Sequence, residues 1–449
     1  MPEKCRFSKR AALLILLFVI LCEILVTLSY ERGILAVQHY AMPVAFAFLG
    51  MTLLSGRTKV SVDERIALLY PAWYLISRLL LRELYLDDSF YNFCSLCLIY
   101  ALAFPFAHWA KDEQRKAGLC AVAILFAVAY GILAWIGVMA AVGRQPITLP
   151  YLGTAFTIEE NGIKRLGMST HPNVTAGIFF SALVLTIWFA FHFKKHWAIL
   201  PAVVLGLGLY LAIGLTDSRT VMLQVSVLFA AIVFLSFQRL KIPSQIIRYL
   251  IAFGAAAAVL LLTYFSFSAM IEWLNLAYHQ MIPNAIAEAA DQAAQEMEHL
   301  SAGRSVLLAA DSLYGRNVHY RGVFKLIAEH PDVLIRGTRV SDLGMVMDYL
   351  EGVNAHNSYL QILIDAGIVG LAIAVWFTIR VFWVAVKVVF YHEKRSTFAD
   401  KVLAVIPVTL LLNAVTESYV FTELKPYYCL IFFLTLGYAI AHERTLRVK

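Results

Sequence analysis

Charged residues are scarce in this chain, and that scarcity decides its broad class. Only 15% of its 449 residues are charged, 61% are hydrophobic, and the mean hydropathy is +0.72. A soluble domain is about one quarter charged and about half apolar. The composition therefore excludes an ordinary soluble protein. The chain has no low-complexity tract and few linkers, so we predict one polytopic, all-α integral membrane domain.

Several catalytic motifs are also missing from the sequence. It has no glycine-rich loop ending in lysine for nucleotide hydrolysis and no Gly-x-Ser-x-Gly nucleophile elbow. An Asp-x-Asp pair, which many metal-dependent sugar-nucleotide enzymes use, is absent too. No group of His, Asp and Glu has the spacing typical of a metal site. A site that uses His319 and His330 is the one alternative that the sequence leaves open. We therefore expect no metal and no other cofactor.

Cysteine and basic residues carry little functional signal. Cys94-Ser-Leu-Cys97 has metal or redox spacing, but no histidine or charged residue lies beside it, so we interpret it as packing. The net charge of +7 lies mostly in short loops, where membrane proteins carry cytoplasmic charge, and does not indicate a nucleic-acid partner.

Long apolar runs are plentiful. A helix needs about 20 apolar residues to cross the bilayer. The basic N-terminus and the apolar run 11–28 resemble a signal peptide, but the run reaches spanning length and no cleavage pattern follows, so we expect a retained helix. The sequence predicts about twelve spans: 11–28, 34–54, 66–86, 93–109, 118–140, 173–193, 198–215, 221–237, 246–268, 362–390, 402–421 and 427–442.

Lysine and arginine gather in alternate loops, which sets the expected orientation. Loops around Lys59, Lys116 and Lys194, together with both termini, are basic and are therefore predicted to be cytoplasmic. The domains expected are 1–268 with nine transmembrane helices, 269–361 as a large periplasmic loop, and 362–449 with three more helices. The long loop is expected to be a helical lid, with helices at 283–298 and 323–328.

Three residues on the predicted outer side are the strongest candidates for catalysis. Arg219 stands in a short turn between two spans, where a cation costs about 2.5 kcal/mol or more unless it has a partner or a role. It either pairs with Asp217 or holds a phosphate through its fork of donors. Arg316 stands in a turn that opens a helix. His356 precedes an apolar helix and either caps it or accepts a proton from a hydroxyl.

Further polar residues could contact the substrate. Arg165 is a second candidate anion ligand, and Asn173 is a helix cap or a polar contact. Arg78 lies deeper in its span than Arg82, which we interpret as an interfacial anchor. Gly367 and Gly370 are expected to allow close helix packing.

Together these motifs resemble the O-antigen ligase and polymerase superfamily of membrane glycosyltransferases, whose architecture is GT-C-like. The resemblance is most specific between Arg165 and Gly370. Tyr320 departs from the pattern, in which tryptophan is commoner, and so do the added cations in 335–339. The matching residues are Arg165, Gly167 and His171-Pro172-Asn173; Ser218-Arg219; Gly315-Arg316, Tyr320 and His330-Pro331; and His356-Asn357, Leu360-Gln361 and 367–371.

For the ligases, the resemblance implies transfer of a polysaccharide from undecaprenyl pyrophosphate to lipid A–core oligosaccharide, in lipopolysaccharide biosynthesis at the periplasmic face of a Gram-negative inner membrane. It implies that Arg316 and Arg219 hold the pyrophosphate without a metal, and that His356 activates the acceptor hydroxyl for inverting attack. Arg165, Asn173, Arg78, Tyr320 and Asn357 are the further substrate contacts predicted.

Three alternatives remain open from the sequence. An O-antigen or exopolysaccharide polymerase and a protein O-oligosaccharyltransferase belong to the same superfamily and differ in acceptor. A lipid-linked sugar flippase is a different class, and it should scatter charged residues through the bundle interior. The candidates here gather at one predicted face, which favours an enzyme.

Overall fold

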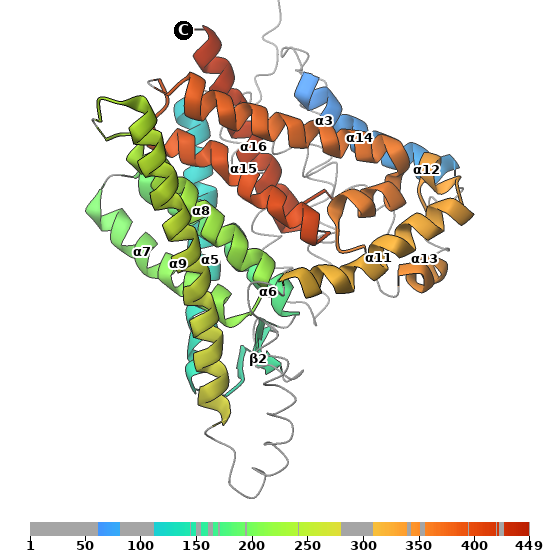
Figure 1. The fold of residues 1–449 in the computed structure, drawn as a ribbon, viewed down its shortest axis with the longest axis horizontal. Helices are drawn as coiled ribbons and strands as arrows, with labels where there is room; N and C mark the ends of the chain where they lie inside the picture. The colour runs from blue at the N-terminus through green and yellow to red at the C-terminus, as the bar shows by residue number, and fades with distance from the viewer. Residues whose placement is uncertain are drawn as a thin grey trace, which may run out of the picture.

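The computed structural model is an assembly of long helices with one small sheet (Figure 1). The predicted spans 11–28, 34–54 and 93–109 and the predicted helix 283–298 lie outside the described residues. The residues that the structure describes are 62–80, 112–143, 145–149, 154–159, 165–168, 171–193, 195–240, 242–279, 309–338, 343–350, 355–393, 395–418, 420–421 and 426–448.

Eight of the described helices are long and apolar enough to cross a membrane. They coincide with eight of the predicted spans and confirm an all-α, multi-pass membrane protein. A ninth predicted span, 66–86, overlaps the described helix α3, Val62–Leu80. The eight are α5 Asp112–Gly143, α6 Pro172–His192, α7 His196–Leu215, α8 Arg219–Phe237, α9 Gln245–His279, α14 Ser358–Val386, α15 Phe398–Thr416 and α16 Pro426–Val448.

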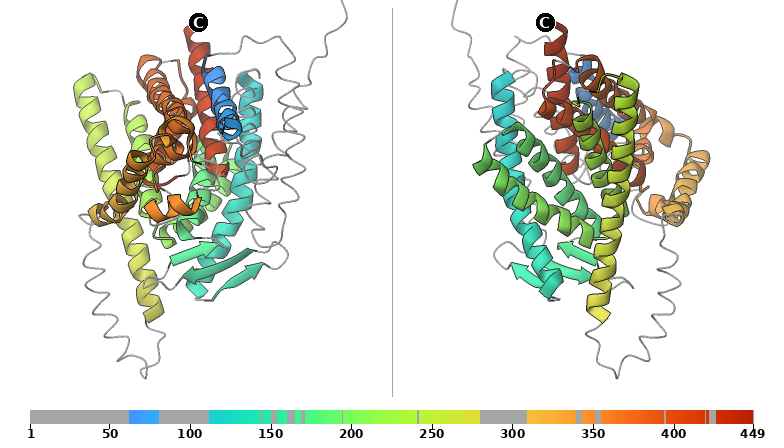
Figure 2. Two further views of the ribbon diagram at one scale, coloured as in Figure 1. Left: turned by 90° about the vertical axis from the view of Figure 1, so that its right-hand side faces the viewer. Right: turned by 60° about the vertical axis from the view of Figure 1, so that its left-hand side comes forward.

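The helices differ in how far the protein itself covers them. Within the apolar windows, 83% of α6 and of α16 is buried, whereas only 17% of α9 is. An apolar helix that the protein leaves uncovered suits a lipid environment, because lipid satisfies apolar side chains as well as a core does. We conclude that α6 and α16 form the centre of the bundle and that α9 lies at its edge (Figures 1 and 2).

A three-stranded antiparallel sheet fills part of the segment between α5 and α6. Its strands are β1 Ile147–Leu149, β2 Thr154–Glu159 and β3 Arg165–Met168, in the order β1-β2-β3. It lies at the end of the bundle away from the C-terminus (Figure 2). Phe156 and Leu166 turn inward and join the core against α5. The sequence analysis predicts no strand here; the sheet gives β3 a fixed place beside α6.

Helix α14 is broken at Gly367, which has φ +65°. A Cβ at this position would lie 2.7 Å from the carbonyl oxygens of Leu334 and Ile335. The break exposes carbonyls that other elements satisfy: Thr338 N–H donates to Ile364 O at 2.7 Å, and Trp73 Nε1 donates to Ala366 O at 2.7 Å. Gly367 therefore permits a sharp bend against a short helix rather than the packing of two long helices.

Three further helices lie beside the bundle, at the right of Figure 1. They are α11 Ala309–Glu329, α12 Val333–Arg336 and α13 Leu343–Leu350. A second small core, which includes Val323 and Leu350, joins α11 and α13 to α14. The helix predicted at 323–328 is thus much longer than expected. Its end before His330-Pro331 is confirmed, since the residue before proline avoids helical angles.

Candidate functional site

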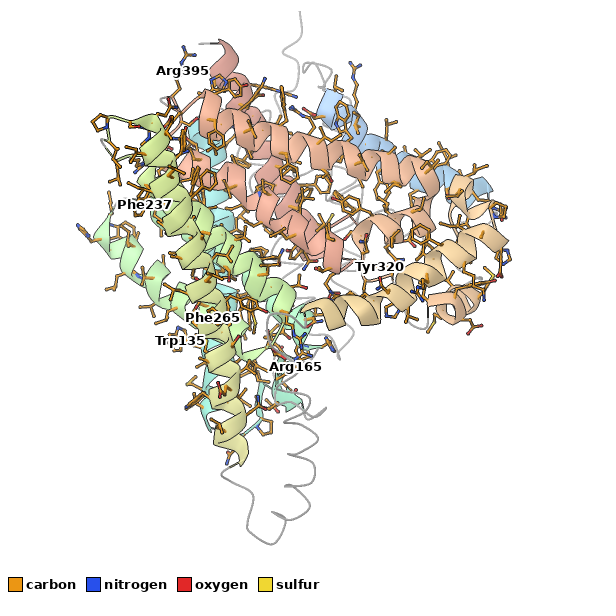
Figure 3. All side chains as sticks on the ribbon, viewed as in Figure 1. Trp135, Arg165, Phe237, Phe265, Tyr320 and Arg395 are labelled. Carbon is orange, nitrogen blue, oxygen red and sulfur yellow. The ribbon has the colours of Figure 1, made fainter. Side chains whose placement is uncertain are left out.

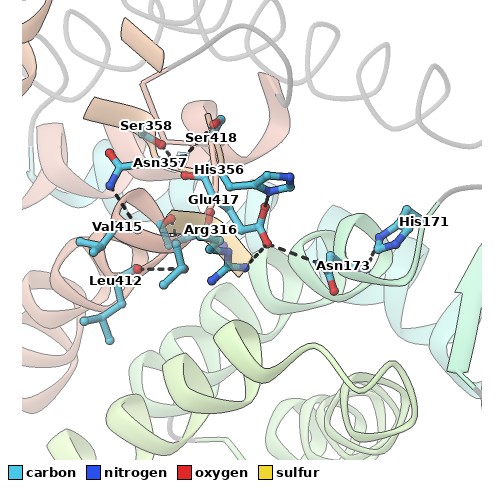
Figure 4. A network of polar contacts seen from close by, with 12 residues as sticks. His171, Asn173, Arg316, His356, Asn357, Ser358, Leu412, Val415, Glu417 and Ser418 are labelled. Atoms are coloured by element: carbon cyan, nitrogen blue, oxygen red, sulfur yellow. Dashed lines mark hydrogen bonds and ion pairs between the residues drawn. The ribbon is translucent and has the colours of Figure 1, made fainter. Parts of the chain in front are cut away.

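The centre of the candidate site is a buried carboxylate, that of Glu417, just beyond the last residue of α15. Its side chain is only 4% exposed. Arg316 Nη2 lies 3.0 Å from Oε1, His356 Nδ1 lies 3.2 Å from Oε2, and Asn173 Nδ2 lies 3.4 Å from Oε1 (Figure 4). A buried carboxylate needs such partners, because desolvation of an unpaired charge costs several kcal/mol. Glu417 therefore joins α6, α11, α14 and α15 at one point.

His356 reaches Glu417 because the start of α14 is attached to the end of α15. The Ser358 hydroxyl donates to the Glu417 carbonyl at 2.8 Å, and Asn357 N–H donates to Ser418 Oγ at 3.2 Å. Asn357 Oδ1 caps α14 by accepting from the backbone N–H groups of the second and third residues after it. The cap is therefore Asn357 rather than His356, which leaves the imidazole available for other contacts.

The backbone at His356 adopts a left-handed conformation, with φ +45°. Asp217, with φ +50°, is the other non-glycine residue of the described part with a positive φ, and it belongs to the turn before α8. Such a conformation costs on the order of 1–3 kcal/mol and persists only where neighbouring contacts impose it. Both strained residues adjoin the polar network, as is common at functional sites.

Asn173 extends the network from Glu417 to the turn between α7 and α8. Its Oδ1 accepts from Arg165 Nη2 at 2.8 Å, and Arg165 Nε donates to the Thr216 carbonyl at 2.9 Å. Arg165 Nη2 also lies 3.3 Å from the Asp217 carbonyl oxygen. Arg165, whose place on β3 is shown in Figure 3, thus holds the turn against α6.

The predicted cap at Asn173 is instead His171, whose Nδ1 accepts from the Asn173 N–H at 3.3 Å, with Pro172 in the first turn. The side chain of Asn173 instead makes polar contacts with Arg165 and Glu417, which is the second of the two roles that the sequence predicts for it.

Arg219 is the first residue of α8, directly after the N-cap Ser218. It stands two residues beyond Asp217, whose carbonyl accepts from Arg165. The structure thus brings the Ser-Arg turn next to the residues that lead to Glu417. This neighbourhood suits an anion, because a helix N-terminus presents unpaired N–H groups and a partial positive charge.

Arg316 lies within α11, not in a turn that opens a helix as the sequence suggests. Four residues on, the Tyr320 hydroxyl donates to the Val415 carbonyl at 3.1 Å, and Asn357 Nδ2 donates to the same oxygen at 3.1 Å (Figures 3 and 4). Residues four apart share a helix face, so α11 presents both Arg316 and Tyr320 to the end of α15.

Arg78 lies on α3. The neighbouring Ser77 hydroxyl donates to the Arg336 carbonyl, which places this part of α3 beside α12. The side chain of Arg78 lies outside the described part of the chain.

Two contacts at the site are absent from the sequence prediction. The predicted span 402–421 includes Glu417, whereas α15 ends at Thr416. The sequence does contain a signal, since a carboxylate inside a span is costly and usually functional. The second involves His319, which the sequence analysis considers only as a metal ligand: its ring centroid lies 5.1 Å from that of His356, and its Nδ1 contacts the Leu350 carbonyl.

The arrangement can orient an imidazole and present cations beside it. A carboxylate on Nδ1 keeps the proton on that nitrogen and leaves the lone pair on Nε2, as in other histidine–carboxylate pairs. Arg316 uses one of its donors on Glu417 and has further N–H groups for another anion. Among the described residues, no group of three or more His, Cys, Asp and Glu side chains is placed to hold a metal.

Comparison with known families gives a match. Residues 203–375 match the family model described as O-antigen ligase. This segment belongs to the O-antigen ligase family. The matched segment contains all three predicted catalytic residues, Arg219, Arg316 and His356, and ends before Glu417.

The resemblance predicted from the sequence is thereby confirmed at the level of the family. The match over residues 203–375, with the membrane helices, supports a membrane glycosyltransferase-like enzyme that acts on lipid-linked substrates. No curated protein and no solved structure matches the chain.

Proposed function

We propose that this protein is an O-antigen ligase that transfers a polysaccharide from undecaprenyl pyrophosphate to lipid A–core oligosaccharide, without a metal and with inversion. The hydrogen bond between His356 and Glu417 carries the proposal. It supplies an oriented imidazole next to an arginine, which are the two groups needed to activate a hydroxyl and to stabilise a departing pyrophosphate.

In the proposed reaction, His356 Nε2 accepts the proton of the acceptor sugar hydroxyl. That hydroxyl oxygen forms a bond to the anomeric carbon while the bond from this carbon to the pyrophosphate oxygen breaks. The electron pair leaves with undecaprenyl pyrophosphate. Glu417 stabilises the imidazolium as it forms, because its carboxylate already accepts from Nδ1 at 3.2 Å. Glu417 is therefore a positioning residue, not one that contacts the substrate.

Arg316 and Arg219 are proposed to bind the pyrophosphate from two sides. Guanidinium groups offer a planar fork of donors that matches phosphoryl oxygens. Arg316 is held beside His356 through the shared Glu417, which couples the positions of leaving-group ligand and base. Arg165, Asn173, Tyr320 and Asn357 are proposed to support these groups and line the substrate path. Arg78 is retained as a proposed contact with the lipid-linked donor from α3.

The site is proposed to face the periplasm of a Gram-negative bacterium, with both termini in the cytoplasm. The positive residues in alternate loops support this orientation. In that arrangement, 1–268 and 362–449 form the transmembrane part, and 269–361 is a periplasmic segment that covers the donor.

The test is transfer by the purified protein in detergent with lipid-linked glycan and a metal chelator present. Product on lipid A–core supports the ligase, and lengthened lipid-linked glycan would select the polymerase instead. Glycan on a protein acceptor would select the protein O-oligosaccharyltransferase. If none of the three products forms although the protein is folded and binds the donor, the proposal is overturned.

A further inference from the structure

A groove outside the Glu417 network lies between α11 and α13. Its volume is about 680 Å³, within the range of small-molecule and oligosaccharide sites. It is lined by Val318, Arg321, Gly322, Lys325, Met345, Asp348 and Tyr349.

The groove is built by close contact of the two helices. A Cβ at Gly322 would lie 2.0 Å from the Tyr349 carbonyl oxygen, so glycine at this position allows α13 to approach α11. Below that contact, the buried side chains of Val323, Leu326, Val346 and Leu350 form the second core. The groove floor is thus fixed by packing, while its rim carries polar side chains.

The rim of the groove carries two cationic side chains, Lys325 and Arg321. Lys325 lies 4.0 Å from Glu329 as an exposed pair, a type that contributes little, and its ammonium lies 5.6 Å from the Tyr349 ring centroid. In the part of the chain that the structure describes, no ion pair or hydrogen bond holds the guanidinium of Arg321. The lining has Arg321 and Lys325 against one carboxylate, Asp348.

The groove is connected to the candidate active site through α11. Val318, Arg321, Gly322 and Lys325 follow helical spacing on one face, whereas Arg316 and Tyr320 face α15. His319 lies between these faces, with its ring 5.1 Å from that of His356 and its Nδ1 on the Leu350 carbonyl of α13. From His319 to Lys325 the helix rises about 9 Å, so Lys325 lies less than two helical turns along α11 from the histidine pair.

We infer that this groove is a subsite for an anionic oligosaccharide, with Arg321 and Lys325 binding its phosphate or carboxylate groups and Asp348 its hydroxyls. Arginine favours such anions because its donors are planar and fixed. The Tyr349 ring offers an apolar surface for a sugar face. The inference rests on the proposed function for its source of ligand, since either the core acceptor or a charged donor glycan supplies this chemistry.

Binding tests the subsite without requiring transfer. The full-length protein in detergent is titrated with delipidated core oligosaccharide, with its phosphates intact or removed by hydrofluoric acid, and with glycan released from the donor lipid. Arg321→Gln and Lys325→Gln should each weaken binding of the anionic probe about tenfold, the effect of losing one charge-assisted hydrogen bond. Arg336→Gln removes a cation from the surface of α12 and should leave binding unchanged.

Transfer kinetics then identify the source. If the core acceptor occupies the groove, the two variants raise the KM for acceptor and leave the KM for donor unchanged; a charged donor glycan gives the reverse. Either result supports the subsite. Equal affinity of the wild-type protein for anionic and neutral forms of every probe would overturn it, as would variants that bind like the wild type. If the wild-type protein binds the anionic probes selectively but transfers no glycan, the proposed function is rejected and the subsite is retained.

Discussion

The imidazole of His356 and the carboxylate of Glu417 form a hydrogen bond of 3.2 Å between residues 61 positions apart in the chain. The carboxylate is 4% exposed and the histidine side chain is 36% exposed. One partner is thus fixed inside the protein while the other reaches the surface of the site. Such a pair sets which nitrogen of the ring carries the proton and leaves the opposite nitrogen directed away from the carboxylate.

Removal of the histidine should abolish transfer and spare donor binding. A positioned general base contributes about 10²–10⁴-fold, so His356→Ala should lose at least about 10²-fold in single-turnover rate at saturating donor. Direct binding of lipid-linked glycan should persist because the arginines remain. His330→Ala is the control, since its ring packs against Tyr349 rather than against His356 or Glu417. His319→Ala should also lower the single-turnover rate less than His356→Ala does. Wild-type transfer by His356→Ala, or loss of binding, would reject the base role.

Glu417→Gln should lower the transfer rate by about 10²-fold, because the amide no longer stabilises an imidazolium on Nδ1. The substitution keeps the size of the side chain, so the fold should remain intact by thermal unfolding. The measurement is the single-turnover rate as a function of pH, compared with His356→Ala and with the double variant. If Glu417 acts through His356, the double variant should be no slower than His356→Ala alone. Independent, multiplicative losses would assign Glu417 a separate role.

Lysine should replace Arg316 and Arg219, the proposed pyrophosphate ligands, poorly. Lysine is a point charge on a flexible stem and lacks the planar fork that binds two phosphoryl oxygens. Arg316→Lys and Arg219→Lys should each express and insert but lose at least about tenfold in transfer. Arg336→Lys, at the exposed pair with Asp332, is the matched control and should transfer normally. Near-normal activity in either site variant would return that arginine to a structural role.

Gly367→Ala should destabilise the protein, because φ is +65° and an added Cβ would lie 2.7 Å from two carbonyl oxygens, which leaves no room for a side chain. The expected cost is about 2 kcal/mol or more, observed as a lower Tm in detergent. Gly254→Ala in α9 is the control: a Cβ there meets nothing within 4 Å, and alanine favours helix. Equal Tm values for the two variants would show that the bend in α14 does not depend on glycine.

Thiol labelling tests the orientation. Cysteine introduced at Gln280 should react with a membrane-impermeant reagent from outside, whereas cysteine at Glu393 should react only after the membrane is opened. Glu393 is preferable to Ala399, which is 5% exposed in the first turn of α15. The wild-type chain is the blank, and its described cysteines, Cys120 and Cys429, are buried. Labelling of both positions from one side would exclude the proposed topology.

The sequence by itself determined the class of the protein and most of its spans. A bilayer demands about 20 apolar residues for each helix, and that demand is local, so eight described spans appear where the hydropathy places them. The motifs around Arg219, Arg316 and His356 are equally local, and they suffice to predict the family that the match at 203–375 confirms.

Tertiary structure alone decided which side chains meet. Glu417 is hidden in a predicted span because hydropathy averages over a window and cannot locate the end of α15. The bond to His356 depends on Ser358 and Asn357 attaching α14 to the residues that follow α15, which no local pattern encodes. The bend at Gly367 likewise depends on α12 packing against it. Contacts between distant segments arise from packing and polar satisfaction, and these are properties of the folded chain.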